Sequence, residues 1–149
     1  MMSEAMDHVV AKFAEAIHAL VAHAGDDPTR EAFEDTPERL ALALMEMAEG
    51  YLHDPALILS KQFVAHHNKQ IVILRDIAFT SICEHHLLPF SGVAYIAYIP
   101  GGSRVVGLSK LARLVTCFAK RFQIQERLTT QIQETLCKHV HTEGVMVVV

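Results

Sequence analysis

Residues 71–100 read IVILRDIAFTSICEHHLLPFSGVAYIAYIP, and this stretch supplies the framework of the fold. Residues 71–82 and 92–100 are rich in β-branched and aromatic side chains, and each segment is short enough to be a strand. The short linker CEHHLLPFS predicts that the two strands pair antiparallel. The polar group Cys83–His86 therefore lies at a strand end or in the connecting loop.

Helical spacing surrounds this strand pair. Apolar residues step by three and four over residues 4–24, and DTPER at 35–39 starts a second helix with Thr36 as its N-cap and Pro37 at the first helical position. Two more helices are predicted over 107–122 and 123–140, before a final strand, VMVVV. The predicted inward positions are Met6, Val9, Phe13, Ile17, Leu20, Leu40, Leu44, Met47, Tyr51, Leu111, Val115, Phe118, Phe122, Ile124, Leu128, Ile132 and Leu136.

This order of elements predicts an α+β fold, with helices packed on one face of an antiparallel sheet. We expect an N-terminal helical segment over residues 1–60 and a second domain over residues 61–149. Met6, Phe13, Met47 and Phe118 are interpreted as core residues.

Composition limits the class of protein. The chain has 149 residues, 51% of them apolar, and its net charge of −4 gives no basic field, so no nucleic-acid partner is expected. Neither a signal peptide nor a membrane span is predicted. Three cysteines at unrelated spacings argue against a disulfide framework and favour the reducing cytoplasm, with Cys117 and Cys137 interpreted as structural.

Cys83 and His86 are spaced as C-x-x-H, with His85 between them. Since positions i and i+3 of a continuing strand point to opposite faces, both side chains reach one ion only if the chain bends. A thiolate and an imidazole suit Zn²⁺, and a second imidazole beside a metal-bound water can move protons. Spacing alone leaves two interpretations open: a zinc site, or a small apolar Cys beside a hydrogen-bonded loop histidine. His66–His67 and His139–His141 can also bind metal, but we interpret them as surface or core-edge histidines.

Five motifs extend this region in a fixed order: GDDPTREAFEDTPERLA, CEHHLLPF, AYIP, VVGLSKLARLV and QIQERLTTQI. Together they resemble GTP cyclohydrolase I over roughly residues 25–149. The resemblance implies a tunnelling fold, in which an antiparallel sheet carries paired helices on its outer face and assembles into a homodecamer. It also implies a reaction that opens the guanine imidazole ring of GTP, releases C8 as formate and yields 7,8-dihydroneopterin triphosphate.

The resemblance implies roles for individual residues around the metal and the base. Cys83 and His86 would be zinc ligands, and His85 would be the acid or base beside the zinc-activated water that adds to C8. Glu126 would accept the N1–H and 2-amino hydrogens of guanine, and Gln125 would supply a neighbouring polar contact. Without the resemblance, Glu126 is simply a solvated helix carboxylate.

Ser109, Lys110 and Arg113 open a predicted helix after Gly107. Backbone N–H groups, a hydroxyl and two cations at a helix N-terminus make a natural phosphate site, although a plain solvated helix start has the same sequence pattern. Ser109 is counted with His85 and Glu126 among the expected catalytic residues. Arg39 in TPER resembles a family arginine that reaches the triphosphate.

Two departures from the family pattern bear on activity. In the family, the strand that begins like GVMVVV continues into a segment carrying a His, the third zinc ligand (a Cys) and an Arg for phosphate, whereas this sequence stops at Val149. We therefore expect a longer functional gene product, and little turnover from a protein that ends at Val149. Leu42 stands where the family usually has a basic residue, which removes one phosphate contact.

Two alternatives to this enzyme remain open. The first is a non-catalytic module that keeps Glu126, Ser109 and Lys110, binds a purine or pterin triphosphate, and joins rings with a full-length paralogue. The second is a related enzyme in which Cys83 is a metal-free nucleophile, although its EHH neighbours favour zinc. The zinc content of the purified protein separates the enzyme from the module.

Overall fold

A computed structural model describes residues 4–65 and 70–149, so His66 and His67 lie outside the described residues. The chain divides into two compact units, Met1–Glu46 and Met47–Val149. This division does not test the domain boundary predicted after residue 60. Compact units are defined by packing, whereas domains are defined by their ability to fold independently, so that boundary stays a prediction.

The first unit contains the helix α1 (Glu4–His23), a short 3₁₀ turn η1 (Glu31–Phe33) and most of α2 (Thr36–Met47). The predicted helix over residues 4–24 is confirmed, but α1 buries none of its residues, and Val9 and Leu20 are exposed. Met6 and Phe13, predicted as core, are only half-buried. A unit this small offers too little apolar surface to cover both faces of a long helix.

The start and the buried face of α2 differ from prediction. The carbonyl of Asp35 accepts the first helical hydrogen bond, from the N–H of Arg39 at 3.0 Å, and the hydroxyl of Thr36 donates to the carbonyl of Ala32. Thr36 is therefore the first helical residue rather than the N-cap. The predicted buried stripe is also wrong in part, because Leu40 is exposed while Ala41 and Pro37 are buried.

The second unit begins with η2 (Glu49–Leu52) and α3 (Pro55–Leu59). Tyr51, which was predicted on the buried face of a helix, lies on η2 and is exposed. Its main sheet has the order β5-β2-β3-β6, from β2 (Val72–Cys83), β3 (Pro89–Pro100), β5 (Phe122–Gln123) and β6 (Thr142–Val148). β3 runs antiparallel to both β2 and β6, while β5 pairs with the end of β2 in parallel. The short strands β1 (Gln62–Val64) and β4 (Arg104–Val106) form a separate pair.

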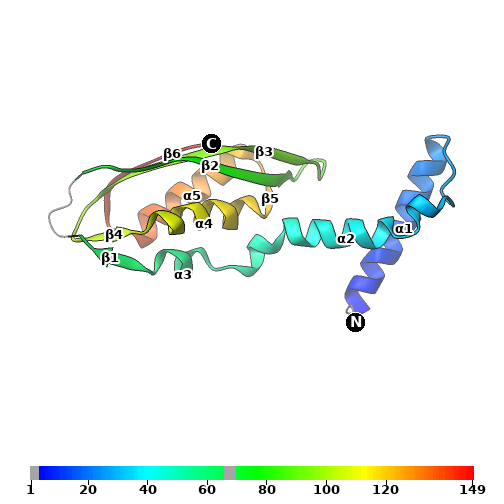
Figure 1. Ribbon diagram of the computed structural model, residues 1–149, viewed down its shortest axis with the longest axis horizontal. Coiled ribbons are helices and arrows are strands. Elements are labelled where there is room, and N and C mark those ends of the chain that lie inside the picture. The colour runs from blue at the N-terminus through cyan, green and yellow to red at the C-terminus, as the bar shows by residue number, and fades with distance from the viewer. Residues whose placement is uncertain (1–3, 66–69) are drawn as a thin grey trace. The chain divides into compact units, whose positions relative to one another are not determined.

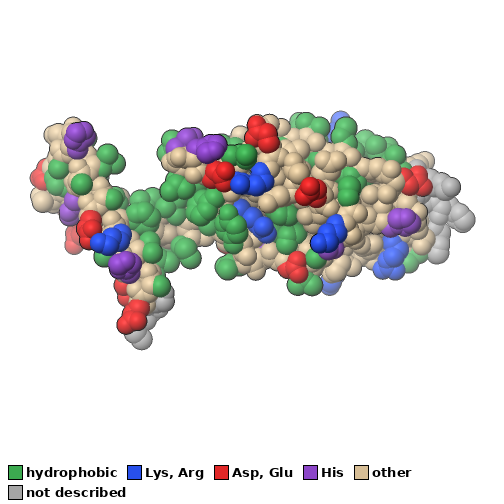
Figure 2. Space-filling view, turned by 180° about the vertical axis from the view of Figure 1, so that it is seen from behind, with side chains coloured by type: hydrophobic (Ala, Val, Ile, Leu, Met, Phe, Trp, Pro, Cys, Tyr) green, Lys and Arg blue, Asp and Glu red, His purple; other side chains and the backbone are tan. Residues whose placement is uncertain are grey.

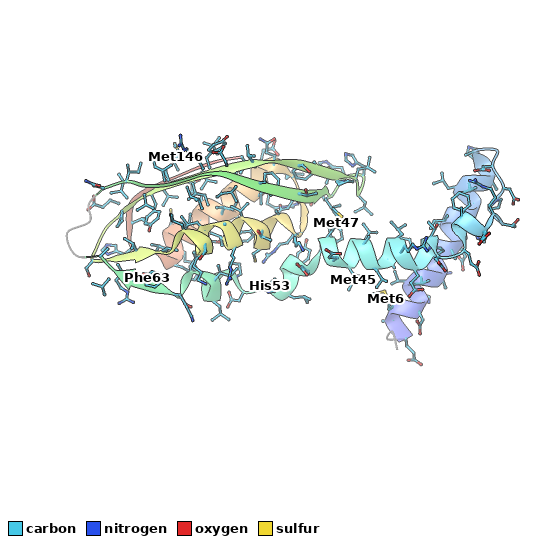
Figure 3. All side chains as sticks on the ribbon, in the orientation of Figure 1. Met6, Met45, Met47, His53, Phe63 and Met146 are labelled. Carbon is cyan, nitrogen blue, oxygen red and sulfur yellow. The ribbon has the colours of Figure 1, made fainter. Side chains whose placement is uncertain are left out.

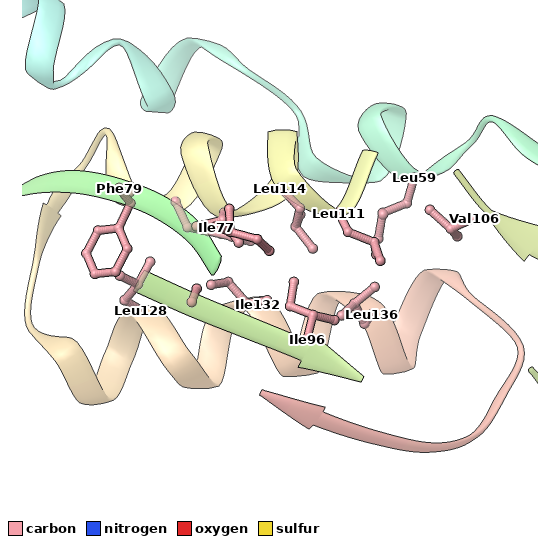
Figure 4. Close-up of a cluster of buried hydrophobic side chains, with 14 of the residues drawn as sticks. Leu59, Ile77, Phe79, Ile96, Val106, Leu111, Leu114, Leu128, Ile132 and Leu136 are labelled. Carbon is pink, nitrogen blue, oxygen red and sulfur yellow. The ribbon is translucent and has the colours of Figure 1, made fainter. Parts of the chain in front are cut away.

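The helices α4 (Leu108–Ala119) and α5 (Gln125–His139) cover one face of the main sheet, which confirms the predicted α+β arrangement (Figure 1). Leu111, Leu114 and Val115 of α4 and Leu128, Ile132 and Leu136 of α5 are fully buried against Ile77, Phe79 and Ile96 of the sheet (Figure 4). Phe118 joins this core as predicted. Phe122 and Ile124 do not follow the predicted helical face: Phe122 lies exposed on β5, and Ile124 is the extended residue before α5.

The other face of the sheet carries exposed apolar side chains. Ile73, Val93, Met146 and Val148 are each more than two-fifths exposed, and Met146 points away from the helices (Figure 3). Among the described residues, no helix combines the length and apolarity that a membrane crossing requires.

Candidate functional site

The bend predicted between Cys83 and His86 is present where β2 meets β3. Cys83 is the last residue of β2; its N–H donates to the carbonyl of Leu88 at 2.9 Å, and its carbonyl accepts from the N–H of Leu87 at 2.9 Å. Leu87 has a φ of 57°, a left-handed conformation that is uncommon for a non-glycine residue and reverses the chain here. The sequence CEHH thus occupies a tight turn rather than a continuing strand.

This turn brings the predicted ligand Cys83 close to His85, the predicted acid or base. The Cys83 sulfur lies 3.9 Å from Nδ1 of His85, and the thiol is half-buried while both imidazoles are exposed. Nδ1 of His86 accepts a hydrogen bond from the N–H of Leu88 at 3.2 Å. This bond must break on metal binding, because Nδ1 either loses its lone pair to the metal or gains a proton when Nε2 binds. Within residues 4–65 and 70–149, no three Cys, His, Asp or Glu side chains are grouped as a metal site would require.

Glu84, the remaining residue of the tetrapeptide, faces α5 instead of Cys83. Its carboxylate forms an ion pair with Arg127, and its N–H donates to the carbonyl of Gln123 at 3.0 Å. Arg127 also donates through Nε to the Gln123 side chain at 3.2 Å. Gln123 is almost fully buried and donates to the carbonyl of Phe118 at 2.9 Å and to Oε1 of Gln131 at 2.8 Å. This network fixes the turn to the first turn of α5.

Gln125 and Glu126 start α5 on the same side as this network, and both are exposed. Gln125 donates to the carbonyl of Val149 at 2.6 Å, so the end of β6 lies beside the start of α5. Glu126 immediately precedes Arg127, the partner of Glu84, and its carboxylate lies near the positive end of the helix dipole. The structure therefore brings Glu126 and Gln125 to the same end of the unit as Cys83, and Figure 2 shows histidine side chains beside acidic and basic ones at one end of this unit.

Ser109 and Lys110 lie in the first turn of α4, at the other end of the helix, and Arg113 is the sixth of its 12 residues. The helix begins at Leu108 after Gly107, whose carbonyl accepts from the N–H of Lys110 at 2.8 Å. The 12 residues of α4 span about 18 Å, and β5 then leads directly into α5. Within one copy of the chain, most of the length of α4 therefore separates Ser109 and Lys110 from the predicted metal and base residues, and Arg113 lies about halfway along it.

The other predicted residues do not join either group in the second unit. Arg39 lies in the first unit, exposed and paired with Asp35 at 2.8 Å. His139 is the last residue of the 15-residue helix α5, and the ring of His141 packs beside Gly101 and Gly102. Neither histidine can complete a metal site at Cys83 of the same copy. Cys117 is buried and Cys137 exposed, and burial raises the pKa of the Cys117 thiol.

Sequence reasoning missed two features of this region. The ion pair between Glu84 and Arg127 joins residues 43 positions apart, and only the opposite charges in CEHH and QERL hint at it. Lys61 lines a pocket of about 440 Å³ together with Lys110 and Arg113. No local pattern marks Lys61, because it follows α3 as a single charge.

Comparisons with known proteins agree with the motifs. The family model for GTP cyclohydrolase I matches residues 13–149. GTP cyclohydrolase 1 of Chlorobium phaeovibrioides is 44% identical over 141 residues, which cover 95% of this chain and 63% of the relative. The enzymes of the same name from Corynebacterium aurimucosum and Bacillus cytotoxicus are 47% and 46% identical, over 90% and 98% of this chain and 68% and 73% of their own lengths.

The chain thus spans 63% of the length of the Chlorobium relative, which is less than two thirds of that protein. The family model nevertheless covers nearly the whole chain, and the three relatives far exceed 30% identity over at least 90% of it. The chain belongs to the GTP cyclohydrolase I family.

Proposed function

We propose that this chain is the greater part of a zinc-dependent GTP cyclohydrolase I, which converts GTP to 7,8-dihydroneopterin triphosphate and formate. The observation that carries the proposal is the turn at the end of β2, which holds a thiol and two imidazoles beside the carboxylate-bearing start of α5. The donor set fits zinc, because a thiolate and a neutral imidazole are ligands that zinc prefers.

Cys83 and His86 would hold the zinc, which would supply a water of lowered pKa for addition to C8 of guanine. His85, whose Nδ1 lies 3.9 Å from the Cys83 sulfur, would take a proton from that water and return one to a ring nitrogen as the C–N bond opens. Glu126 would accept hydrogen bonds from N1–H and the 2-amino group, which selects guanine because adenine lacks both donors. Gln125 would add a polar contact beside it.

Ser109, Lys110 and Arg113 would bind the triphosphate, and Arg39 would add a further cationic contact to it. Because most of α4, which spans about 18 Å, lies between Ser109 and Lys110 and the start of α5, we propose that a complete site combines residues from more than one copy of the chain. The uncovered apolar face of the sheet, with Ile73, Val93 and Met146 exposed, supports a homo-oligomer, for which the decamer is our proposal.

The first test compares zinc binding by two variants, each of which lacks one cysteine. Cys83→Ala removes the proposed thiolate ligand, whereas Cys137→Ala removes an exposed thiol of α5 and serves as the matched control. We expect Cys83→Ala to lower zinc affinity by more than about 100-fold, beyond the loss typical of residues that only support a ligand. Affinity is measured by competition with a chelator, and turnover by the fluorescence of the oxidised product.

Equal zinc affinity of the two variants would contradict the proposed site, as would full turnover of GTP after exhaustive chelation. The non-catalytic binding module remains the second candidate, because no three metal-ligating side chains are grouped in the described parts of the chain. A metal-free protein that binds GTP, and loses that binding in Glu126→Gln, would favour the module over the enzyme.

A further inference from the structure

Three cationic side chains line one pocket at the start of α4. Lys110 and Arg113 come from α4 itself, and Lys61 comes from the link between α3 and β1. The pocket has a volume of about 440 Å³, and Leu57 and Ile58 of α3 form its apolar wall. His53, labelled in Figure 3, lies on the segment between η2 and α3 and lines the same pocket.

The charges of this pocket are not neutralised by the protein. Within the described residues, Lys61, Lys110 and Arg113 have no carboxylate partner, whereas Lys120 pairs with Glu49 and Arg127 with Glu84. The carboxylate that lines the pocket is Asp54, and its Oδ1 accepts the N–H of Ala56 at 2.8 Å as the N-cap of α3. Three cations against one carboxylate leave an excess of positive charge in a chain whose net charge is −4.

The backbone on both sides of Lys61 is fixed, although its side chain is exposed. Leu59 is fully buried in the core, and Ser60 caps α3 through its N–H to the carbonyl of Leu57. Gln62 donates through Nε2 to the carbonyl of His139 at 3.0 Å and accepts from Arg104 at its own carbonyl. The position of Lys61 at the rim of the pocket is therefore set by the fold, and only the side chain has to order when an anion binds.

We propose that Lys61, the third cation of this pocket, is a further contact for the triphosphate of the substrate. The inference rests on the proposed function, which assigns Lys110, Arg113 and Arg39 to that triphosphate. A fully ionised triphosphate carries more negative charge than these three cations neutralise, and a lysine ammonium at the rim can follow a phosphate oxygen with three donors. Lys120, which is held by Glu49, takes no part.

The test compares Lys61→Gln with Lys138→Gln by isothermal titration calorimetry. Lys138 is an exposed lysine in the last turn of α5 that does not line the pocket, so it controls for the loss of one positive charge. With inorganic tripolyphosphate or GTP as the titrant, we expect Lys61→Gln to lower affinity about fivefold, as for one exposed ion pair, and Lys138→Gln to leave it unchanged. The difference should shrink as salt is added.

Equal affinities of Lys61→Gln and Lys138→Gln for tripolyphosphate overturn the inference, and so does a wild-type chain that binds no tripolyphosphate. Guanosine, which lacks phosphate, separates this result from a failure of the proposed function. Suppose that tripolyphosphate binding depends on Lys61, but that GTP binds no more tightly than tripolyphosphate and guanosine does not bind. The contact of Lys61 with the anion is then supported, and the proposed guanine site is contradicted.

Discussion

The two ends of α4 differ in how their charged side chains are satisfied. At the carboxyl end, Lys120 pairs with Glu49, Arg121 donates to the carbonyls of Gly50 and Cys117, and Arg127 pairs with Glu84. Towards the amino end, Lys110 and Arg113 line a pocket with Lys61 and have no ion-pair partner among the described residues, although Arg113, halfway along α4, also lines the neighbouring pocket that contains Glu49 and Lys120.

The difference indicates two separate tasks. A turn that must hold metal donors in fixed positions needs partners supplied by the protein, because each unsatisfied group would let the turn move. A pocket for an anion needs the opposite arrangement, since cations that are already paired have little to offer a phosphate. We call these regions the paired end and the open end of α4.

The largest expected effect comes from breaking the packing at the paired end. A Cβ at Gly50 would lie 2.1 Å from the carbonyl oxygen of Cys117 and 2.5 Å from that of Lys120, and both are backbone atoms. The Gly50 N–H also donates to the Lys120 carbonyl at 2.8 Å. We therefore expect Gly50→Ala to lower the free energy of unfolding by about 3 kcal/mol and the Tm by roughly 10 °C, measured by thermal and urea unfolding.

Gly144→Ala is the matched control for this substitution. A Cβ at Gly144 on β6 would meet only Cδ1 of Ile99, at 4.0 Å, which is an ordinary contact. We expect a change of less than about 0.5 kcal/mol. Equal destabilisation by the two variants would show that the close approach of η2 to α4 does not hold the paired end together.

The second effect concerns the ion pair that fixes the turn at the paired end. Glu84→Gln keeps the shape of the side chain but removes the charge that Arg127 binds. We expect zinc affinity, measured by chelator competition, to fall by about 10-fold, as for residues that orient metal ligands. Glu134→Gln, an exposed carboxylate of α5, should leave zinc affinity unchanged.

A double-mutant cycle with Arg127→Met distinguishes a positioning role from a general loss of stability. If the pair acts as a unit, Glu84→Gln adds little once Arg127 is gone. Additive losses of zinc affinity, or losses that follow Tm across the variants, would argue that Glu84 does not position the turn through Arg127.

Around the paired end, the sequence predicted the longer strands and helices but not the short strands or the contacts between distant residues. The strands around CEHH were predicted to within a few residues, because both segments are short and rich in β-branched and aromatic side chains. The helical patterns of α4 and α5 were equally clear, and the inward positions Leu111, Leu128 and Leu136 are fully buried. β1, β4 and β5 were not predicted, since strands of two or three residues leave no period to detect.

Where the sequence failed, the missing information concerned distant neighbours. A spacing of three and four shows that Leu40 and Leu20 belong to apolar faces, but it does not show whether any element covers those faces, and both residues are exposed. The donors predicted at Cys83–His86 form a local pattern, so their spacing alone was enough to propose them, and the metal site stays a prediction. The pairing of Glu84 with Arg127, and the position of Lys61 beside Arg113, depend on contacts across the fold and were missed.

The smallest expected effect comes from substituting Lys120, a lysine near the pocket whose charge is neutralised by Glu49. The hydrogen bond and charge of Lys120, with a smaller contribution from His53, hold the pKa of Glu49 below its ordinary value of 4.5. A lowered folded-state pKa means that the pair stabilises the fold above pH 4.5 and that this stabilisation is lost as the pH falls below it. Lys120→Met should therefore have a slightly lower Tm than the wild type at pH 7, and the gap should close as the pH falls below 4.5 and Glu49 is protonated. The same variant should bind tripolyphosphate like the wild type, because Lys120 is engaged with Glu49. A weaker affinity would show that the open end extends along α4 to Lys120, and that the contrast between the two ends is one of degree.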